Sequence, residues 1–307
     1  MQILGKSNFN FIKWRWHAIV FSAAIITIGI GQIIAQRGPK LGVDFSGGTA
    51  MVLKFQQPVT EDVVRNALAS TGDKTVQRYG AASDNAILIR LPQTVVSEEG
   101  TILDDAADQV DGLLRQANVG VFTRESTEIV GPVVGQDLQR KGIYATLTAL
   151  AGIMIYIGFR FRFTFAAGAI VATMHDVLIA LVMLNWFNYE LSLNIVAALL
   201  TMTGYSVNDT IVVFDRVREN ARTMRKDSLD MQVNTSVNQT LSRTVITAGT
   251  TFLAVFGLYM YGGEVLEGFA FTMLVGIVAG TYSTVFIAAA IAILLTGKPP
   301  SVLAATA

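Results

Sequence analysis

Residues 199–220 of the chain, LLTMTGYSVNDTIVVFDRVREN, place a carboxylate, Asp209, inside an otherwise apolar stretch. An ionisable side chain at membrane depth costs roughly 2.5–3.5 kcal/mol on insertion scales. Such a residue usually persists because it is paired, hydrated or used in function. The fold therefore depends on whether this stretch is one of several membrane spans, and the function depends on what Asp209 does there.

The composition of the chain is that of a membrane protein. Of its 307 residues, 52% are hydrophobic and only 15% are charged, and the mean hydropathy is +0.49. The formal net charge is zero, so no overall basic balance suggests nucleic-acid binding. The chain has no cysteine and only two histidines, which excludes a disulfide framework and a thiolate- or histidine-built metal site. We expect no bound cofactor and no nucleic-acid partner.

Six apolar runs are each near the length of about 20 residues that crosses the hydrocarbon core. They lie at residues 17–35, 142–159, 163–184, 191–214, 245–261 and 268–295. The first run is long and no clear A-x-A cleavage pattern follows it, so we expect an uncleaved anchor rather than a signal peptide. The predicted organisation is a cytoplasmic N-terminus with the first helix (1–35), a polar extracytoplasmic domain (36–140), a bundle of helices two to six (141–296) with a basic cytoplasmic loop (215–243), and a cytoplasmic tail (297–307).

The distribution of Lys and Arg predicts the orientation of these spans. Basic residues gather before the first run, between the second and third, and between the fourth and fifth. The alternate short loops, at residues 185–190 and 262–267, contain no Lys or Arg. The basic loops and both termini are therefore predicted to be cytoplasmic. Basic residues that flank the polar domain on its outer side are a minor exception, because long translocated domains largely escape the rule.

The polar domain alternates between strand and helix patterns. Strand patterns lie at residues 48–56, 75–79, 86–91 and 121–130, and helical spacing lies at 60–70, with Thr60 as a candidate N-cap, and at 97–117. The order β-α-β-β-α-β is that of a ferredoxin-like fold. That fold hosts many functions. Because the domain lacks a Ser-His-Asp set, a phosphate loop and any histidine, we expect no hydrolytic site in it.

Polar residues on the fourth and fifth runs recur at helical spacing, so that each set shares one face of its helix. They are Thr201, Tyr205, Asn208 and Asp209 on the fourth run, and Arg243, Thr247, Thr250 and Thr251 on the fifth. If the two stripes face each other, attraction to Arg243 favours the ionised carboxylate and burial opposes it. A small movement would then change the protonation of Asp209, which is what ion coupling requires.

The ionisable residues of these runs could also have simpler, structural roles. Asp209 lies about five residues from the end of its run, or ~7–8 Å of helix, so it could reach interfacial water or pair structurally. Arg243 begins its run and could extend to lipid headgroups. His175 and Asp176 form a second buried ionisable pair, on the third run. Because adjacent residues point in different directions, a hydrogen bond to a neighbouring helix is favoured there over a relay.

Six motifs along the chain resemble those of the SecF family, the smaller membrane subunit of the SecD–SecF part of bacterial protein export. They are LGVDFSGGT (41–49), VGPVVGQDL (130–138), HDV (175–177), GYSVNDTIVVFDRVREN (204–220), NQTLSRTVITAGTT (238–251) and YGGEVLEGF (261–269). Each motif alone is a weak signal. Together they follow the family order, lie on the expected sides of the membrane and cover essentially the whole chain.

The resemblance implies an α-helical polytopic protein of the cytoplasmic (inner) membrane. Its six transmembrane helices would form an RND-like half, related by pseudo-symmetry to six helices of SecD, with the ferredoxin-like extracytoplasmic domain between helices one and two. The implied partners are SecD, the SecYEG channel, a YajC-like accessory subunit, unfolded preprotein and membrane lipid. The implied role is a transport subunit rather than an enzyme, which uses the proton-motive force with SecD to complete preprotein translocation.

The resemblance also assigns roles to residues. It implies that Asp209 and Arg243 serve ion movement, with H⁺ or Na⁺ as the coupling ion. The polar stripes and the buried pair on the third run add candidate supporting residues, which are Thr201, Tyr205, Asn208, Thr247 and Asp176. Motion would pass to the polar domain through two glycine-containing links, which comprise Asp44, Gly47 and Gly48 in one and Gly131 and Gly135 in the other. Two alternatives are a passive scaffold of a translocation complex and half of an RND-type small-molecule exporter.

Overall fold

The structure is a computed structural model that describes residues 8–71, 74–80, 84–91 and 104–296. The chain forms two compact units. The helical unit contains Met1–Pro39, Thr146–Tyr189 and Asn194–Ala307. The sheet unit contains Lys40–Ala145 and Glu190–Leu193.

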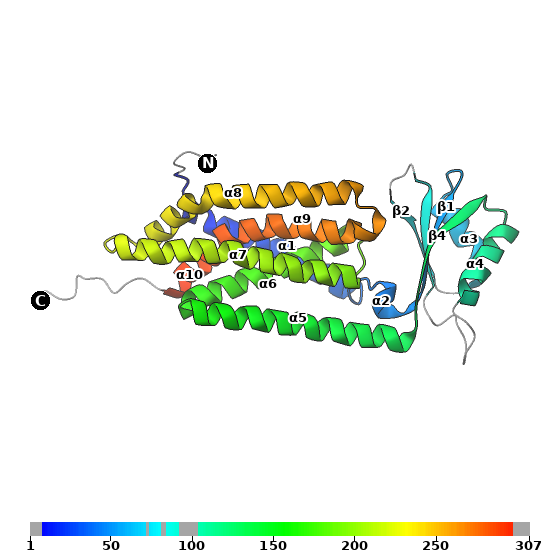
Figure 1. Ribbon diagram of the computed structural model, residues 1–307, viewed down its shortest axis with the longest axis horizontal. Coiled ribbons are helices and arrows are strands. Elements are labelled where there is room, and N and C mark those ends of the chain that lie inside the picture. The colour runs from blue at the N-terminus through cyan, green and yellow to red at the C-terminus, as the bar shows by residue number, and fades with distance from the viewer. Residues whose placement is uncertain (1–7, 72–73, 81–83, 92–103, 297–307) are drawn as a thin grey trace, which may run out of the picture. The chain divides into compact units, whose positions relative to one another are not determined.

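Long apolar helices build the helical unit (Figure 1). Within the described residues, six helices are long and apolar enough to cross a membrane. They are α1 (Arg15–Ala35), which follows the 3-10 turn η1 (Ile12–Trp14), α5 (Pro132–Arg160), α6 (Phe163–Trp186), α7 (Leu193–Thr223), α8 (Leu229–Tyr261), and α9 (Glu264–Ser283) continued by the π-helical η4 (Thr284–Ala288) and α10 (Ala289–Thr296). The six predicted spans are thereby confirmed as helices of sufficient length.

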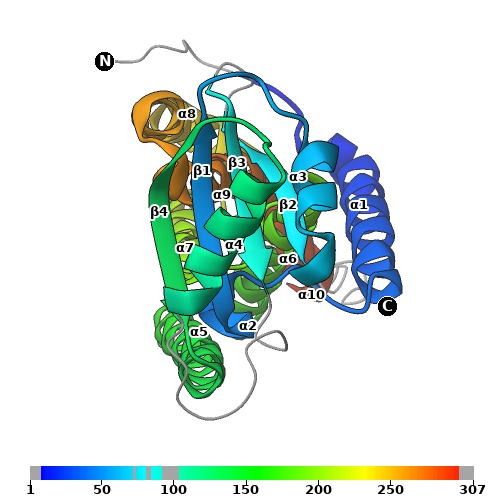
Figure 2. The same cartoon turned by 90° about the vertical axis from the view of Figure 1, so that its right-hand side faces the viewer.

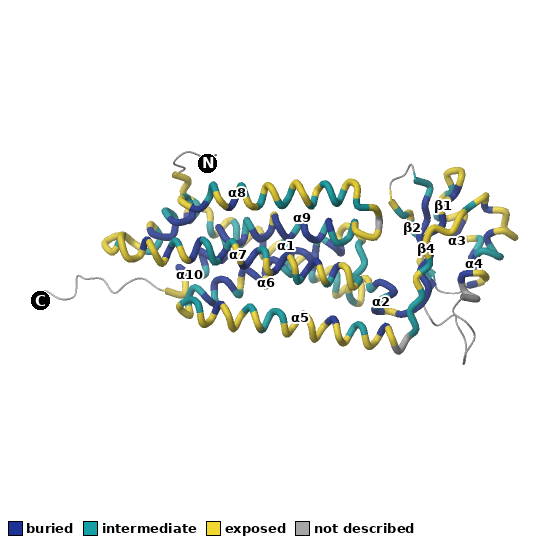
Figure 3. The backbone as a smooth tube through the Cα atoms, viewed as in Figure 1, coloured by how far each residue is buried: buried dark blue, intermediate teal, exposed yellow. Residues whose placement is uncertain are grey.

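The six helices differ in how much of their surface is buried. Helices α6, α7 and α9–α10 carry most of the buried side chains, whereas α1, α5 and α8 expose long apolar faces (Figure 3). Near one end of the unit, Phe214 of α7 packs edge-to-face against Phe161 and Phe165, with ring centroids 6.0 and 5.1 Å away. Exposed apolar faces of this length suit lipid or another membrane protein.

Helices α7 and α8 both extend beyond the predicted spans. The segment 215–243, predicted as a loop, is helical except for residues 224–228, so that prediction was wrong about its structure. The two extensions pack through polar side chains: Asn220 Nδ2 donates to Ser236 Oγ at 2.8 Å and to Gln239 Oε1 at 2.9 Å. Apolar periodicity locates only the membrane-depth part of such helices, which explains the error.

Four antiparallel strands form the sheet unit, with α3 and α4 against one face of the sheet (Figure 2). In chain order the elements are α2 (Val43–Ser46), β1 (Gly48–Phe55), α3 (Glu61–Ala67), η2 (Ala69–Thr71), β2 (Thr75–Tyr79), β3 (Ala86–Leu91), α4 (Asp104–Gln116) and β4 (Phe122–Val130). The strand order is β2-β3-β1-β4. In this register Met51 of β1 lies opposite Ile89 of β3 and Thr127 of β4.

The core of the sheet unit lies between the sheet and these two helices. Leu53 and Ile89 from the sheet, Val64 from α3 and Leu114 from α4 are all fully buried in one cluster. The predicted strands at 75–79 and 86–91 match β2 and β3. Thr60 occupies the N-cap position of α3, as predicted, although its side chain makes no capping hydrogen bond. Of the helix predicted at 97–117, residues 97–103 lie outside the described residues.

Candidate functional site

Asp209 lies on α7 with its carboxylate directed at α8. Its Oδ1 accepts a hydrogen bond from Thr244 Oγ1 at 2.7 Å. Its Oδ2 is buried and has no hydrogen-bond partner in the described part of the chain. One turn earlier on α7, the side chain of Tyr205 interacts with Thr251 of α8. The two polar stripes therefore meet, and they leave one carboxylate oxygen free to bind a proton.

Arg243, the base predicted to serve Asp209, is not in direct contact with it. Among the described residues, no ion pair within 4.0 Å joins the two side chains, and Arg243 is exposed. The neighbouring residue, Thr244, reaches the carboxylate instead. Adjacent residues on a helix point about 100° apart, so the contact lies one residue along from the predicted face. Arg243 acts on Asp209 only through longer-range attraction.

The other predicted residues of the two stripes lie on the outer side of this contact. Thr201, Asn208 and Thr247 are all exposed on the helical unit. Thr201 Oγ1 donates to the backbone oxygen of Ala197 at 2.8 Å, which satisfies its hydroxyl within α7. Exposed polar groups on membrane-depth helices are poorly suited to lipid. This exposed polar strip, formed by Thr201, Asn208, Arg243 and Thr247, is therefore suited to water or to a second membrane protein.

Asp176 is fully buried, at 0% exposure, where α6, α7 and α9 meet. Its Oδ2 accepts hydrogen bonds from Ser206 Oγ of α7 at 2.5 Å and Ser283 Oγ of α9 at 2.8 Å. Its Oδ1 lies 2.9 Å from His175 Nδ1, so the prediction that these adjacent side chains point apart was wrong. The predicted hydrogen bond from Asp176 to a neighbouring helix is confirmed, and it is made to two helices. A buried polar group so fully satisfied stabilises one arrangement of those helices.

Helix α7 also approaches α9 closely on this side. A Cβ atom added at Gly276 would lie 2.6 Å from a methionine Cβ of α7, and one added at Gly280 would lie 2.8 Å from Ser206 Cβ. Both distances are shorter than real Cβ contacts, so only glycine fits. At the start of η4, Thr284 Oγ1 and Thr210 Oγ1 of α7 lie 2.8 Å apart. One face of α7 is thus fixed to α6 and α9, while another carries Asp209 toward α8.

The first predicted link lies in the sheet unit and binds the segment before α7. Asp44 Oδ2 accepts a hydrogen bond from the backbone N–H of Leu193, the first residue of α7, at 2.9 Å. The backbone N–H of Leu191 donates to the oxygen of Lys40 at 2.7 Å, and the N–H of Gly42 donates to the oxygen of Leu191 at 2.8 Å. Because the N-terminal N–H groups of a helix lack internal partners, a carboxylate there is stabilising.

The glycines of the two links have different roles. Gly47 and Gly48 have φ of 71° and 119°, a region that glycine adopts far more readily than other residues. A Cβ at Gly135 would lie 3.0 Å from the backbone nitrogen of Gly47, whereas one at Gly131 would meet open space. Gly135 lies inside α5, so the second link is largely helical.

Family models and curated relatives that match this chain carry related descriptions. The family model described as protein export membrane protein SecD/SecF, C-terminal, matches residues 110–298, and the model of the SecD/SecF GG motif matches residues 33–59. The protein translocase subunit SecF of Escherichia coli O157:H7 is 39% identical over 296 residues, which cover 96% of this chain and 90% of that protein. The protein of the same description from Vibrio alginolyticus is 40% identical over 297 residues, covering 96% and 92%.

Solved structures of SecDF also match this chain. The crystal structure of SecDF, a translocon-associated membrane protein from Thermus thermophilus, superposes with a TM-score of 0.83 at 33% identity over 94% of this chain. SecDF in its super-membrane-facing form gives 0.68 at 33% identity over 95% of this chain. This chain spans only 39% of the length of either SecDF chain. Its family model, its curated relatives and its structural neighbours therefore agree, and the chain belongs to the SecF family of protein translocase subunits of the inner membrane.

Proposed function

We propose that this chain works with SecD to complete preprotein export, and that it uses proton movement through the membrane to do so. The observation that carries the proposal is the state of Asp209, which has one oxygen bonded to Thr244 and the other buried without a partner in the described structure. Such a carboxylate can gain or lose a proton while keeping its bond to Thr244. A purely structural acid is expected to have both oxygens satisfied, as Asp176 has.

Partnership with SecD is supported by the exposed polar strip and by the length of the chain relative to SecDF. SecDF is a single chain of which this chain matches 39%. We infer that a SecD half with six further helices, in an RND-type arrangement, covers the strip and supplies the other half of the ion path. The SecYEG channel and a YajC-like subunit are further expected partners, unfolded preprotein is the cargo, and lipid surrounds the remaining helices.

The orientation and the class of the sheet unit are part of the same proposal. The basic ends of α7 and α8 and both termini are expected in the cytoplasm by the positive-inside rule. The sheet unit is expected outside, where it would meet the emerging preprotein. Its strand order, with two helices on one face, supports a ferredoxin-like class.

The proposed movement is between α8 and the group formed by α6, α7 and α9. Hydrogen bonds through Asp176 and close glycine contacts hold α7 to α6 and α9. The contact of α7 with α8, in contrast, includes the bond between Asp209 and Thr244, whose strength depends on the charge of the carboxylate. One charge crossing 100 mV carries about 2.3 kcal/mol. That energy biases a two-state equilibrium about fiftyfold, so several ions per cycle would give strong directionality.

The test is preprotein translocation into inverted membrane vesicles with and without a proton-motive force. Asp209→Asn is expected to abolish the stimulation by the force while recovery of SecD with the complex stays normal. Asp215→Asn is the matched control, because this acid of the same helix is exposed and its ion pair, with Arg160 at 2.7 Å, is on the surface. Stimulation that survives in Asp209→Asn would favour the passive scaffold. Stimulation that follows a sodium gradient instead would identify Na⁺ as the coupling ion.

The small-molecule exporter is not proposed. The curated relatives at about 40% identity are described as translocase subunits. No observation of this chain favours a small-molecule cargo over a polypeptide.

A further inference from the structure

The segment that joins α6 to α7 belongs to the sheet unit. Residues Glu190–Leu193 group with Lys40–Ala145 and not with the two helices they connect. Leu191 forms a parallel β-bridge with Leu41, and Asp44 holds the N–H of Leu193. The main chain that leads into α7 is therefore bound to the segment just before β1.

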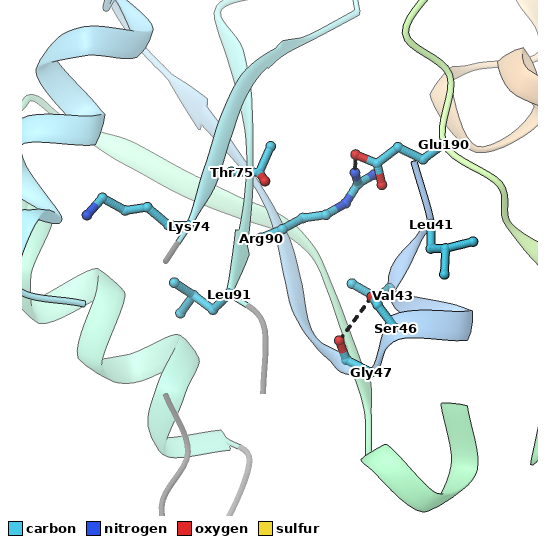
Figure 4. A pocket seen from close by; sticks show the side chains of 9 residues that line it. All are labelled: Leu41, Val43, Ser46, Gly47, Lys74, Thr75, Arg90, Leu91 and Glu190. Carbon is cyan, nitrogen blue, oxygen red and sulfur yellow. Dashed lines mark hydrogen bonds and ion pairs between the residues drawn. The ribbon is translucent and has the colours of Figure 1, made fainter. Parts of the chain in front are cut away.

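A pair of charged side chains strengthens this attachment. Arg90 extends from β3 to the carboxylate of Glu190, with which it forms an ion pair (Figure 4). The side chains are only 20% and 11% exposed. Gln77 Nε2 of β2 lies 3.5 Å from the same carboxylate. The pair borders a hollow of about 330 Å³ whose other walls include Leu41 and Leu91.

Arg90 is largely buried and keeps its positive charge. Burial lowers the pKa of Arg90 to about 10, against the opposing attraction of Glu128, Tyr79 and Asp44. The guanidinium is therefore still charged at neutral pH. Among the described residues, Glu190 is the only ion-pair partner of Arg90. A buried charge that loses its partner is strongly destabilised, which favours keeping Glu190 in place.

We propose that Arg90, Glu190 and Asp44 form a latch that makes the start of α7 move together with the sheet unit. The three are positioning residues for ion-coupled transport, and this proposal rests on the proposed function. The covalent links at the two ends of residues 40–145 lead to α1 and α5, which are helices with little burial. The latch acts on α7 itself, the helix that carries Asp209. It thus adds a third connection, which runs along α7 from Asp209 to the sheet unit.

The first test measures the attachment without any transport. In the purified chain, hydrogen exchange of a peptide spanning residues 187–193 is expected to be slow, because the N–H groups of Leu191 and Leu193 are bonded. Glu190→Ala should raise its exchange rate at least tenfold. Glu125→Ala, which removes an exposed ion pair with Lys54 in the same unit, should leave it unchanged. Equal exchange in the wild type and Glu190→Ala would overturn the latch.

The second test measures stimulation by the proton-motive force in vesicles. Arg90→Ala, Glu190→Ala and the double variant should lose the stimulation to the same extent, since each breaks one connection. Translocation without the force and recovery of SecD should match Glu125→Ala. If Asp209→Asn loses the stimulation and Glu190→Ala retains it, the latch is wrong and the proposed function stands. If Asp209→Asn also retains it, the proposed function fails.

A third measurement separates transmission from mere stability. Because the chain has no cysteine, Arg90→Cys combined with Glu190→Cys can be bridged by a flexible bismaleimide. The unbridged variant is expected to lose the stimulation and the bridged one to regain most of it. If bridging restores exchange protection but not stimulation, the attachment is structural only and the proposed coupling role is refuted. This comparison uses one protein preparation, so differences in folding do not enter.

Discussion

Replacement of Asp176 separates a structural acid from an ion-carrying one. Its carboxylate makes two hydrogen bonds between helices, to Ser206 and Ser283. Hydrogen bonds between membrane helices are worth ~0.6 kcal/mol on average and at most ~1.7. Asp176→Ala should therefore destabilise the chain by about 1–3 kcal/mol. Asp176→Asn should cost below ~1 kcal/mol, because its carbonyl oxygen can accept from both serines.

The assay is unfolding of the purified chain by SDS in mixed micelles, followed by circular dichroism. Thr203→Val is the control, since its buried hydroxyl donates to the backbone oxygen of Leu199 within α7 itself. Asp176→Asn should also keep its stimulation by the proton-motive force in vesicles. If Asp176→Asn destabilises the chain as much as Asp176→Ala, the negative charge itself is required. That result would refute the view that this network needs only hydrogen-bond acceptors, and it would return Asp176 to the list of ion-path residues.

Two further predictions concern glycines. Gly280→Val should push α7 away from α9, because its Cβ would lie 2.8 Å from Ser206 Cβ. The expected loss of stability is about 1–3 kcal/mol. Gly204→Val, whose Cβ would meet open space, should cost far less in the same SDS titration. Gly47→Ala should cost about 1–3 kcal/mol, because φ of 71° and ψ of 166° form a region nearly exclusive to glycine. Thermal unfolding should show this loss, and Gly131→Ala, with normal φ and no close neighbour, should unfold as the wild type does.

Much of the fold follows from local sequence pattern. Apolar length locates the six spans, and short runs of β-favouring residues locate β2 and β3, because both signals are contained within the element itself. The polar ends of α7 and α8 escape the same method. They are stabilised by amide and hydroxyl contacts of Asn220 with Ser236 and Gln239, which are distant in sequence and have no periodicity.

The candidate site could be predicted only in part. Helical spacing identifies the face of α7 that carries Asp209, but the rotation of α8 against that face depends on packing of whole helices. A shift of one residue replaces Arg243 with Thr244 as the contact. The pairing of Arg90 with Glu190 was missed because nothing in the local sequence of either residue indicates it. The only available signal is an acid in a loop between two spans.

The membership of residues 190–193 in the sheet unit bears on how the protein is made. Synthesis reaches this segment only after β4, α5 and α6. Domains generally fold as units as the chain emerges. The guanidinium of Arg90, however, can pair with Glu190 only after α6 has been synthesised and inserted into the membrane. Completion of the sheet unit is thus tied to correct insertion of the helices. A chain with a misinserted α6 would keep a buried cation without its partner, a defect that surveillance by proteases can recognise.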